Sequence, residues 1–127
     1  LIRATLRILG DDLDPDLATA EIGVAPTGRH RTGDPMPGFP MHRRPTGSWG
    51  LDSDLPETAS LQEHVARLLD RVDGKQAAIG QLVAPGCAAE LYCSCFVAPR
   101  GALALEADNL ARIASFGLAL TIATYQE

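Results

Sequence analysis

The stretch AELYCSCFVA, residues 89–98, is the feature that most constrains the fold of this chain. It is far shorter than a membrane span, and it carries apolar side chains at both odd and even positions. On a β-strand these positions face opposite sides of the sheet, so such a strand needs cover on both faces. The stretch therefore predicts a central strand. The PRG that follows predicts a turn into a second strand, ALALE, and hence a β-hairpin.

Other short patterns predict further strands and a first helix. IRATLRIL, residues 2–9, alternates apolar and polar side chains, which predicts a half-buried strand. GSWGLDS and LALTIATY predict two more strands. Between the first two of these strands, Asp14 is suited to cap a helix that starts at Pro15, and Gly23 is suited to end it.

The most regular helical pattern follows Ser60. Ser60 and Glu63 have the spacing of a capping box, in which each side chain bonds to the backbone of the other residue. Behind them, apolar residues share one helical stripe: Leu61, Val65, Leu68, Leu69 and Val72. We expect His64 at the edge of this stripe.

Two further helices complete the predicted fold. One short helix is expected to end at Pro85 and Gly86, and another, capped by Asp108, is expected to end at Gly117. The order of elements predicts a single α+β domain over residues 1–127. It contains a mixed, mostly antiparallel sheet of about five strands with helices mainly on one face, ferredoxin-like or related.

Length and charge exclude several classes of protein. A chain of 127 residues is one domain by length, and its longest apolar run, FGLALTIATY, is half of what a membrane helix needs. Arg3 and Arg7 interrupt the first apolar stretch, so no signal peptide is apparent and the cytoplasm is the default location. The net charge of −5 argues against a dedicated nucleic-acid binder.

Residues 27–47 form a segment rich in proline, glycine and arginine, which we call the Arg-rich segment. Residues 27–50 carry four arginines and one acid, a charge of +3, whereas the rest of the chain has seven bases and fifteen acids, a charge of −8. Loops of this length are usually either functional or disordered. The segment is therefore either a solvated loop or a contact for an anionic ligand, through Arg29, Arg31, Arg43 and Arg44.

Candidate metal and catalytic clusters have structural explanations. The acids at residues 11–16 lack the continuation of a calcium loop, and helix capping accounts for Asp14 and Asp16. Cys93 and Cys95 share a strand face without the flexible spacing of a zinc site, and with Cys87 they are expected to be reduced thiols. The sequence contains no nucleophile elbow and no phosphate loop. We therefore expect no catalytic residues, no metal and no cofactor.

Two aromatic features point to a binding surface. Trp49 is either an anchor that holds the Arg-rich segment or an aromatic platform beside Arg43 and Arg44. Strand alternation also predicts that one sheet face, opposite the helices, collects arginines and aromatic residues, which protein interfaces favour. This face would need cover from the Arg-rich segment, a second copy or a ligand. Its expected members are Arg3, Thr5, Arg7, Tyr92, Ser94, Phe96, Thr121 and Tyr125.

Several motifs together resemble a known family. LRILGDDLDP, VAPTGRHRTGDP, TGSWGL, LQEHVARLLDRV and FGLALTIATY, in this order, resemble the bacterial domain-of-unknown-function family 4279 over nearly the whole chain. The stretch MPGFPMHRRP departs from the family pattern. The resemblance implies a small stand-alone bacterial domain, and it supplies no activity and no site residues.

The sequence leaves three functions open. The first is a non-enzymatic protein-interaction domain, whose partner is a second copy or another protein, bound through Arg7, Tyr92 and Phe96 together with the Arg-rich segment and Trp49. The second is binding of a small anion by the four arginines of that segment. The third is binding of single-stranded nucleic acid on the sheet face, against which the net charge counts. No membrane partner is expected.

Overall fold

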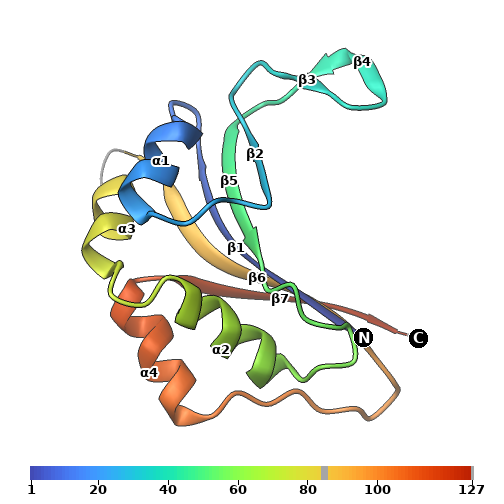
Figure 1. Ribbon diagram of the computed structural model, residues 1–127. Coiled ribbons are helices and arrows are strands. Elements are labelled where there is room, and N and C mark those ends of the chain that lie inside the picture. Colours follow the sequence, from blue (N-terminus) through green and yellow to red (C-terminus); the bar gives the residue numbers. More distant parts are fainter. Residues whose placement is uncertain (84–85, 127) are drawn as a thin grey trace.

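The computed structural model describes residues 1–83 and 86–126 (Figure 1). Its strands are β1 (Ile2–Gly10), β2 (Gly28–His30), β3 (Pro35–Met36), β4 (Phe39–Arg43), β5 (Gly47–Asp52), β6 (Ala88–Val97) and β7 (Ala119–Gln126). Its helices are α1 (Pro15–Ile22), α2 (Leu61–Arg71), α3 (Gln76–Val83) and α4 (Ala107–Phe116).

The main sheet has the strand order β2-β5-β1-β6-β7. Antiparallel pairing joins β2 to β5, β5 to β1 and β1 to β6, whereas β7 runs parallel to β6 after the α4 crossover. β3 and β4 form a separate two-stranded hairpin. The predicted α+β class, with a mixed and mostly antiparallel sheet of five strands, is confirmed for the described residues.

The helices lie on one face of the sheet, and the core fills the space between the two layers (Figure 1). Alternation along β1 turns Leu6 and Ile8 toward the helices, and their register partners Leu91 and Trp49 point the same way. All four of these side chains are fully buried. Burial of such side chains is the main driving force for folding a domain of this size.

Four of the predicted helix ends are confirmed: both ends of α1, the start of α2 and the end of α4. The Asp14 carboxylate accepts hydrogen bonds from the backbone N–H groups of α1's first turn, and Gly23 ends this helix in the left-handed conformation with φ 77°. Ser60 and Glu63 form the complete capping box of α2. Gly117, with φ 68°, ends α4. Each of these signals involves residues within about four positions of each other and acts on the backbone of its own helix end.

The predicted hairpin of residues 89–98 with ALALE is wrong. Residues 102–106 form no strand, although Leu103 and Leu105 pack against the core. Both sides of β6 are already occupied by longer strands, because β1 pairs along one side and β7 along the other. Within the chain, residues 89–98 are covered on one face only, and cover of the other face by a second copy or a ligand stays a prediction. Cys93 and Cys95 are buried, whereas Phe96 on the other face is 43% exposed.

Two details of the helices differ from prediction, and a third prediction falls outside the described residues. α4 has Glu106 at its N-cap, and Asp108 lies in its first turn, where it accepts a hydrogen bond from the Gln62 side chain. His64 is buried, not at the edge of the apolar stripe. The second short helix ends at Val83; Pro85, its expected end, lies outside the described residues.

The Arg-rich segment is more ordered than a loop. It contains β2, which pairs with β5, and the β3–β4 hairpin, which projects from one end of the sheet (Figure 1). The backbone of Asp34 pairs with that of Arg44 at the base of the hairpin. The prolines fit here because edge strands and turns do not need every N–H group.

Candidate functional site

The sheet face opposite the helices is the candidate site, and we call it the outer face. Register pairs connect its residues across the strands: Thr5 lies beside Tyr92, Tyr92 beside Thr121, and Phe96 beside Tyr125. Paired residues point to the same side of a sheet. The predicted grouping is therefore confirmed for all of its members: Arg3, Thr5, Arg7, Tyr92, Ser94, Phe96, Thr121 and Tyr125.

The Arg-rich segment does not lie over the outer face. Its hairpin extends along the direction of the strands, beyond the end of the sheet (Figure 1). Phe96 and Tyr125 accordingly remain 43% and 47% exposed. Cover by this segment, one of the three alternatives that the sequence left open, is therefore wrong for these two side chains.

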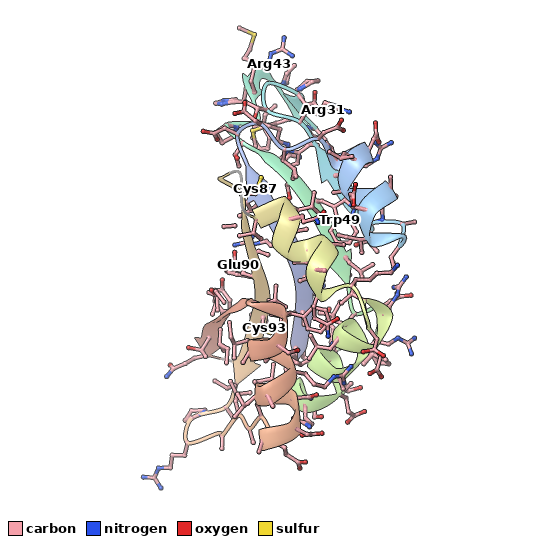
Figure 2. The ribbon with its side chains drawn as sticks, turned by 90° about the vertical axis from the view of Figure 1, so that its left-hand side faces the viewer. Arg31, Arg43, Trp49, Cys87, Glu90 and Cys93 are labelled. Atoms are coloured by element: carbon pink, nitrogen blue, oxygen red, sulfur yellow. The ribbon has the colours of Figure 1, made fainter. Side chains whose placement is uncertain are left out.

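The centre of the outer face is a connected polar group. Nε of Arg7 donates to Glu90 at 2.5 Å, and the hydroxyl of Thr121 donates to the other oxygen of the same carboxylate at 2.9 Å. The Arg7 guanidinium also lies 4.3 Å from the centre of the Tyr92 ring. Figure 2 shows Glu90 and Trp49 on opposite sides of the sheet. These contacts from three strands hold the arginine and the tyrosine in fixed positions.

Aromatic residues form one end of the outer face. The rings of Phe96 and Tyr125 stack with their centres 5.0 Å apart and their planes inclined by 25°. Beside them is a hollow of about 440 Å³, lined by Leu1, Arg3, Glu57, Ser94, Phe96 and Tyr125. One wall of this hollow is an ion pair, in which Nε of Arg3 donates to Glu57 at 2.7 Å. The hollow can accept an apolar side chain beside a charged rim.

A second, polar cleft shares the same ion pair in its lining. It has a volume of about 270 Å³, and both Arg3 and Glu57 line it as well. In its wall the Ser53 hydroxyl lies 2.6 Å from Nδ1 of His64. Burial lowers the pKa of His64, and the Pro56 carbonyl and Glu63 oppose this effect.

This serine–histidine pair was not predicted from the sequence. The sequence contained one signal that Ser53 is buried. Trp49 and Leu51 point inward from β5, and Ser53 continues their alternation. An inward hydroxyl needs a partner, but nothing in the sequence identified His64 as that partner.

The four arginines of the Arg-rich segment are not gathered into one site. Arg29 pairs with Asp16, and Nη2 of Arg31 contacts Asp14 at 2.9 Å and Asp16 at 3.0 Å. The backbone N–H of Leu17 lowers the pKa of the Asp14 carboxyl, and Arg31 adds to this effect. These two arginines therefore already have carboxylate partners at the start of α1.

The other two arginines lie toward the hairpin. Figure 2 shows Arg43 farther along it than Arg31. Arg43 is exposed, and Nε of Arg44 is buried without a hydrogen-bond partner in the described part of the chain.

Trp49 belongs to the core. It is fully buried, and its indole N–H donates to the Thr19 hydroxyl at 3.1 Å. The anchor interpretation fits this position, with a side-chain acceptor in place of the expected backbone, and the exposed platform beside Arg43 and Arg44 is wrong. Burial raises the pKa of the Cys93 thiol to about 12. Among the described residues, no cluster of three or more His, Cys, Asp or Glu side chains has the arrangement of a metal site.

Comparison with known proteins identifies a family match. The family described as Domain of unknown function (DUF4279) matches residues 1–127. No curated protein and no solved structure matches the chain. No helix in the described ranges is long and apolar enough to cross a membrane.

Proposed function

The chain belongs to the DUF4279 family, and from this premise we propose that it is a protein-interaction domain that binds a partner protein through its outer face. The observation that carries the proposal is the combination of Arg7 held against Tyr92 with the stacked, exposed Phe96 and Tyr125. Arginine and aromatic residues are enriched in the centres of protein interfaces. Because contacts already restrain these side chains, less conformational entropy is lost on binding.

The charges of the outer face favour a protein over a nucleic acid. Arg3 pairs with Glu57 and Arg7 pairs with Glu90, so each outer-face arginine has a carboxylate beside it. A phosphate would have to displace these carboxylates or approach them closely. The net charge of −5 opposes such an approach further. A protein segment meets less opposition, because it can place an apolar side chain in the hollow and polar groups on the rim.

Site-specific photocrosslinking tests the proposal. A photoreactive phenylalanine at Ser94 lies between the polar and aromatic parts of the outer face, and the same group at Leu110 reports on the exposed side of α4. We expect a discrete protein adduct at Ser94 and none at Leu110. Equal adducts at both positions, or none at Ser94, would contradict the proposal. An adduct with a second copy of the chain would identify a homodimer as the complex.

A binding measurement with the purified partner then tests individual side chains. Tyr125→Ala removes half of the stacked pair, and Leu110→Ala removes an equally exposed apolar side chain on the helix side. We expect the dissociation constant to rise at least about tenfold for Tyr125→Ala, which corresponds to about 1.4 kcal/mol. Leu110→Ala should leave it unchanged.

Binding of a small anion by the Arg-rich segment is the alternative function. It requires Arg29 and Arg31 to exchange Asp14 and Asp16 for the ligand, whereas Arg43 is exposed. Thermal unfolding with a panel of phosphate-bearing compounds distinguishes the alternatives. An increase in Tm that Arg31→Gln and Arg43→Gln abolish would favour the anion. Single-stranded nucleic acid, the third function, would produce a mobility shift at low salt.

We also propose a bacterial and cytoplasmic setting for the domain. Its three cysteines are free thiols, two of them buried, and this state fits a reducing compartment. Fractionation of a host that expresses the chain at its natural level would test the location.

A further inference from the structure

Strand β7 forms an open edge of the main sheet. β6 pairs along one side of β7, and no strand in the described ranges pairs along the other side. The strand is eight residues long, and most of its side chains are exposed, including Ile122 at 38% and Tyr125 at 47%. An open edge of this length presents a row of unpaired backbone N–H and C=O groups.

β7 lacks the features that normally protect such an edge. Its sequence, ALTIATYQ, contains no charged residue and no proline, and its register with β6 is continuous, without a bulge. The opposite edge of the sheet is different. β2 has only three residues, and its central Arg29 pairs with Asp16. Charges, short strands and bulges prevent sheets from joining at their edges, so β2 is protected and β7 is not.

We propose that β7 pairs with β7 of a second copy of this chain, so that two five-stranded sheets become one ten-stranded sheet. A two-fold axis perpendicular to the sheet makes the two copies of a strand antiparallel, which is the geometry that open sheet edges readily adopt. This inference concerns the edge of the sheet. It therefore goes beyond the outer-face function proposed above.

The composition of β7 favours a second copy over a different partner. In a strand that pairs with itself about a two-fold axis, a charge near the axis would lie close to its own copy, and like charges opposite each other destabilise a sheet. β7 has no charge, although the chain as a whole carries −5. Two-fold pairing also keeps each side chain on its own face. Thr121, Ala123 and Tyr125 would extend the outer face, and Ile122 would be buried on the helix side.

Sedimentation velocity of the purified chain, over a range from low to high micromolar concentration, tests the proposal. We expect a dimer for the wild type. Lysine on β7 should block pairing, so Ile122→Lys and Thr124→Lys should each raise the dimer dissociation constant at least about tenfold. Leu110→Lys, on the exposed side of α4, should leave it unchanged, and Ser94→Lys on β6 probes the outer face instead.

Each result bears on the edge contact alone. A wild-type chain that stays monomeric overturns the inference, and this result needs no variant. A dimer that both β7 lysines leave intact overturns it as well, as does a dimer that only Ser94→Lys dissociates, because the contact would then be the outer face. A failure of the outer-face proposal would instead remove the adduct at Ser94 and leave sedimentation unchanged.

A cysteine scan identifies the pairing directly. In a Cys87→Ser background, Thr121→Cys, Ile122→Cys and Ala123→Cys each place one thiol on β7. A two-fold axis through an antiparallel pair brings one residue opposite its own copy. We therefore expect a disulfide-linked dimer to form readily at one of these positions and poorly at its neighbours. Equal slow crosslinking at all three would contradict the pairing.

Discussion

The hydroxyl of Ser53 and Nδ1 of His64 lie 2.6 Å apart and join the end of β5 to the first turn of α2. Both residues are buried, with 3% and 1% of their surface exposed. Nε2 of His64 has no hydrogen-bond partner in the part of the chain that the structure describes. The bond to Ser53 therefore satisfies Nδ1 of this buried imidazole and leaves Nε2 without a partner among the described residues.

Ser53→Ala should destabilise the fold. The substitution leaves Nδ1 of His64 buried without a partner, which costs about 1–3 kcal/mol in the free energy of unfolding. Urea unfolding measures this cost. Ser48→Ala, in the same strand but on the outer face, is the matched control and should change the free energy by less than about 0.5 kcal/mol. Equal effects of the two substitutions would show that the Ser53–His64 bond contributes no specific stability.

Acidification should destabilise the chain through His64. Burial lowers the pKa of His64 below its usual 6.5, so the unfolded chain binds the proton more readily than the folded chain. Above about pH 6.5 the imidazole is neutral in both states and contributes no pH dependence. As the pH falls below that value, the free energy of unfolding should fall by up to about 1.4 kcal/mol per pH unit, until the pKa of the folded state is passed.

Urea unfolding at a series of pH values, with two histidine variants, assigns this effect. His64→Gln should remove most of the slope, whereas His42→Gln, in the exposed hairpin, should retain it. A smaller slope should remain in His64→Gln, because burial and the charge of Arg44 also lower the pKa of His30. If His64→Gln kept the full pH dependence of the free energy of unfolding, a group other than His64 would be its cause.

Two glycines of β5 should respond differently to alanine. A Cβ atom at Gly47 would lie 2.9 Å from the Gly10 carbonyl oxygen and 3.2 Å from Cβ of Leu13. The nearest atom to a Cβ at Gly50 is 3.5 Å away, in the Thr5 side chain. We expect Gly47→Ala to cost about 1–3 kcal/mol by overpacking, and Gly50→Ala to be neutral or slightly stabilising. Thermal unfolding measures both effects. Equal Tm values for the two variants would contradict the close approach of Gly47 to the Gly10 carbonyl.

The parts of this fold that the sequence predicted well depend on short-range rules. Asp14 before Pro15, and Ser60 three residues before Glu63, act on backbone groups within one helical turn. The alternation of side chains along a strand is also local, so the residues of the outer face were predicted correctly although the hairpin with ALALE was wrong. Pairing depends on competition between distant segments. ALALE had the composition of a strand, but β7 takes the place beside β6.

In the candidate site, too, local features were predicted from the sequence and contacts between distant segments were not. Arg7 and Tyr92 were predicted to share a face, but their contact with Glu90 requires the register between β1 and β6. The composition of the Arg-rich segment suggested four free cations. The fold brings Asp14 and Asp16 to Arg29 and Arg31, because α1 and β2 both lie near β5. These ion pairs depend on the tertiary structure, so the sequence alone does not predict that the two arginines are neutralised.

The three cysteines should differ sharply in reactivity. Thiolate is the reactive form, and burial raises the pKa of Cys93 to about 12. At pH 8 such a thiol is ionised to only about one part in ten thousand. Burial raises the pKa of Cys95 as well, and both side chains are fully enclosed between the sheet and the helices. Burial and Asp12 also raise the pKa of Cys87, but this residue is only half-buried, so it alone remains accessible to a reagent.

A disulfide reagent such as dithionitrobenzoate should therefore titrate one thiol in the folded chain and three after unfolding in urea. Cys87→Ser should abolish the reaction of the folded chain and leave two thiols in urea. Reaction of Cys93 and Cys95 should follow the rate of unfolding, because these thiols become accessible only when the helices separate from the sheet. Mass spectrometry of the modified protein identifies the site. Rapid labelling of Cys93 would contradict its burial on the inner face of β6. It would then also contradict the assignment of the alternate residues of β6 to the outer face, because both assignments follow from the same alternation.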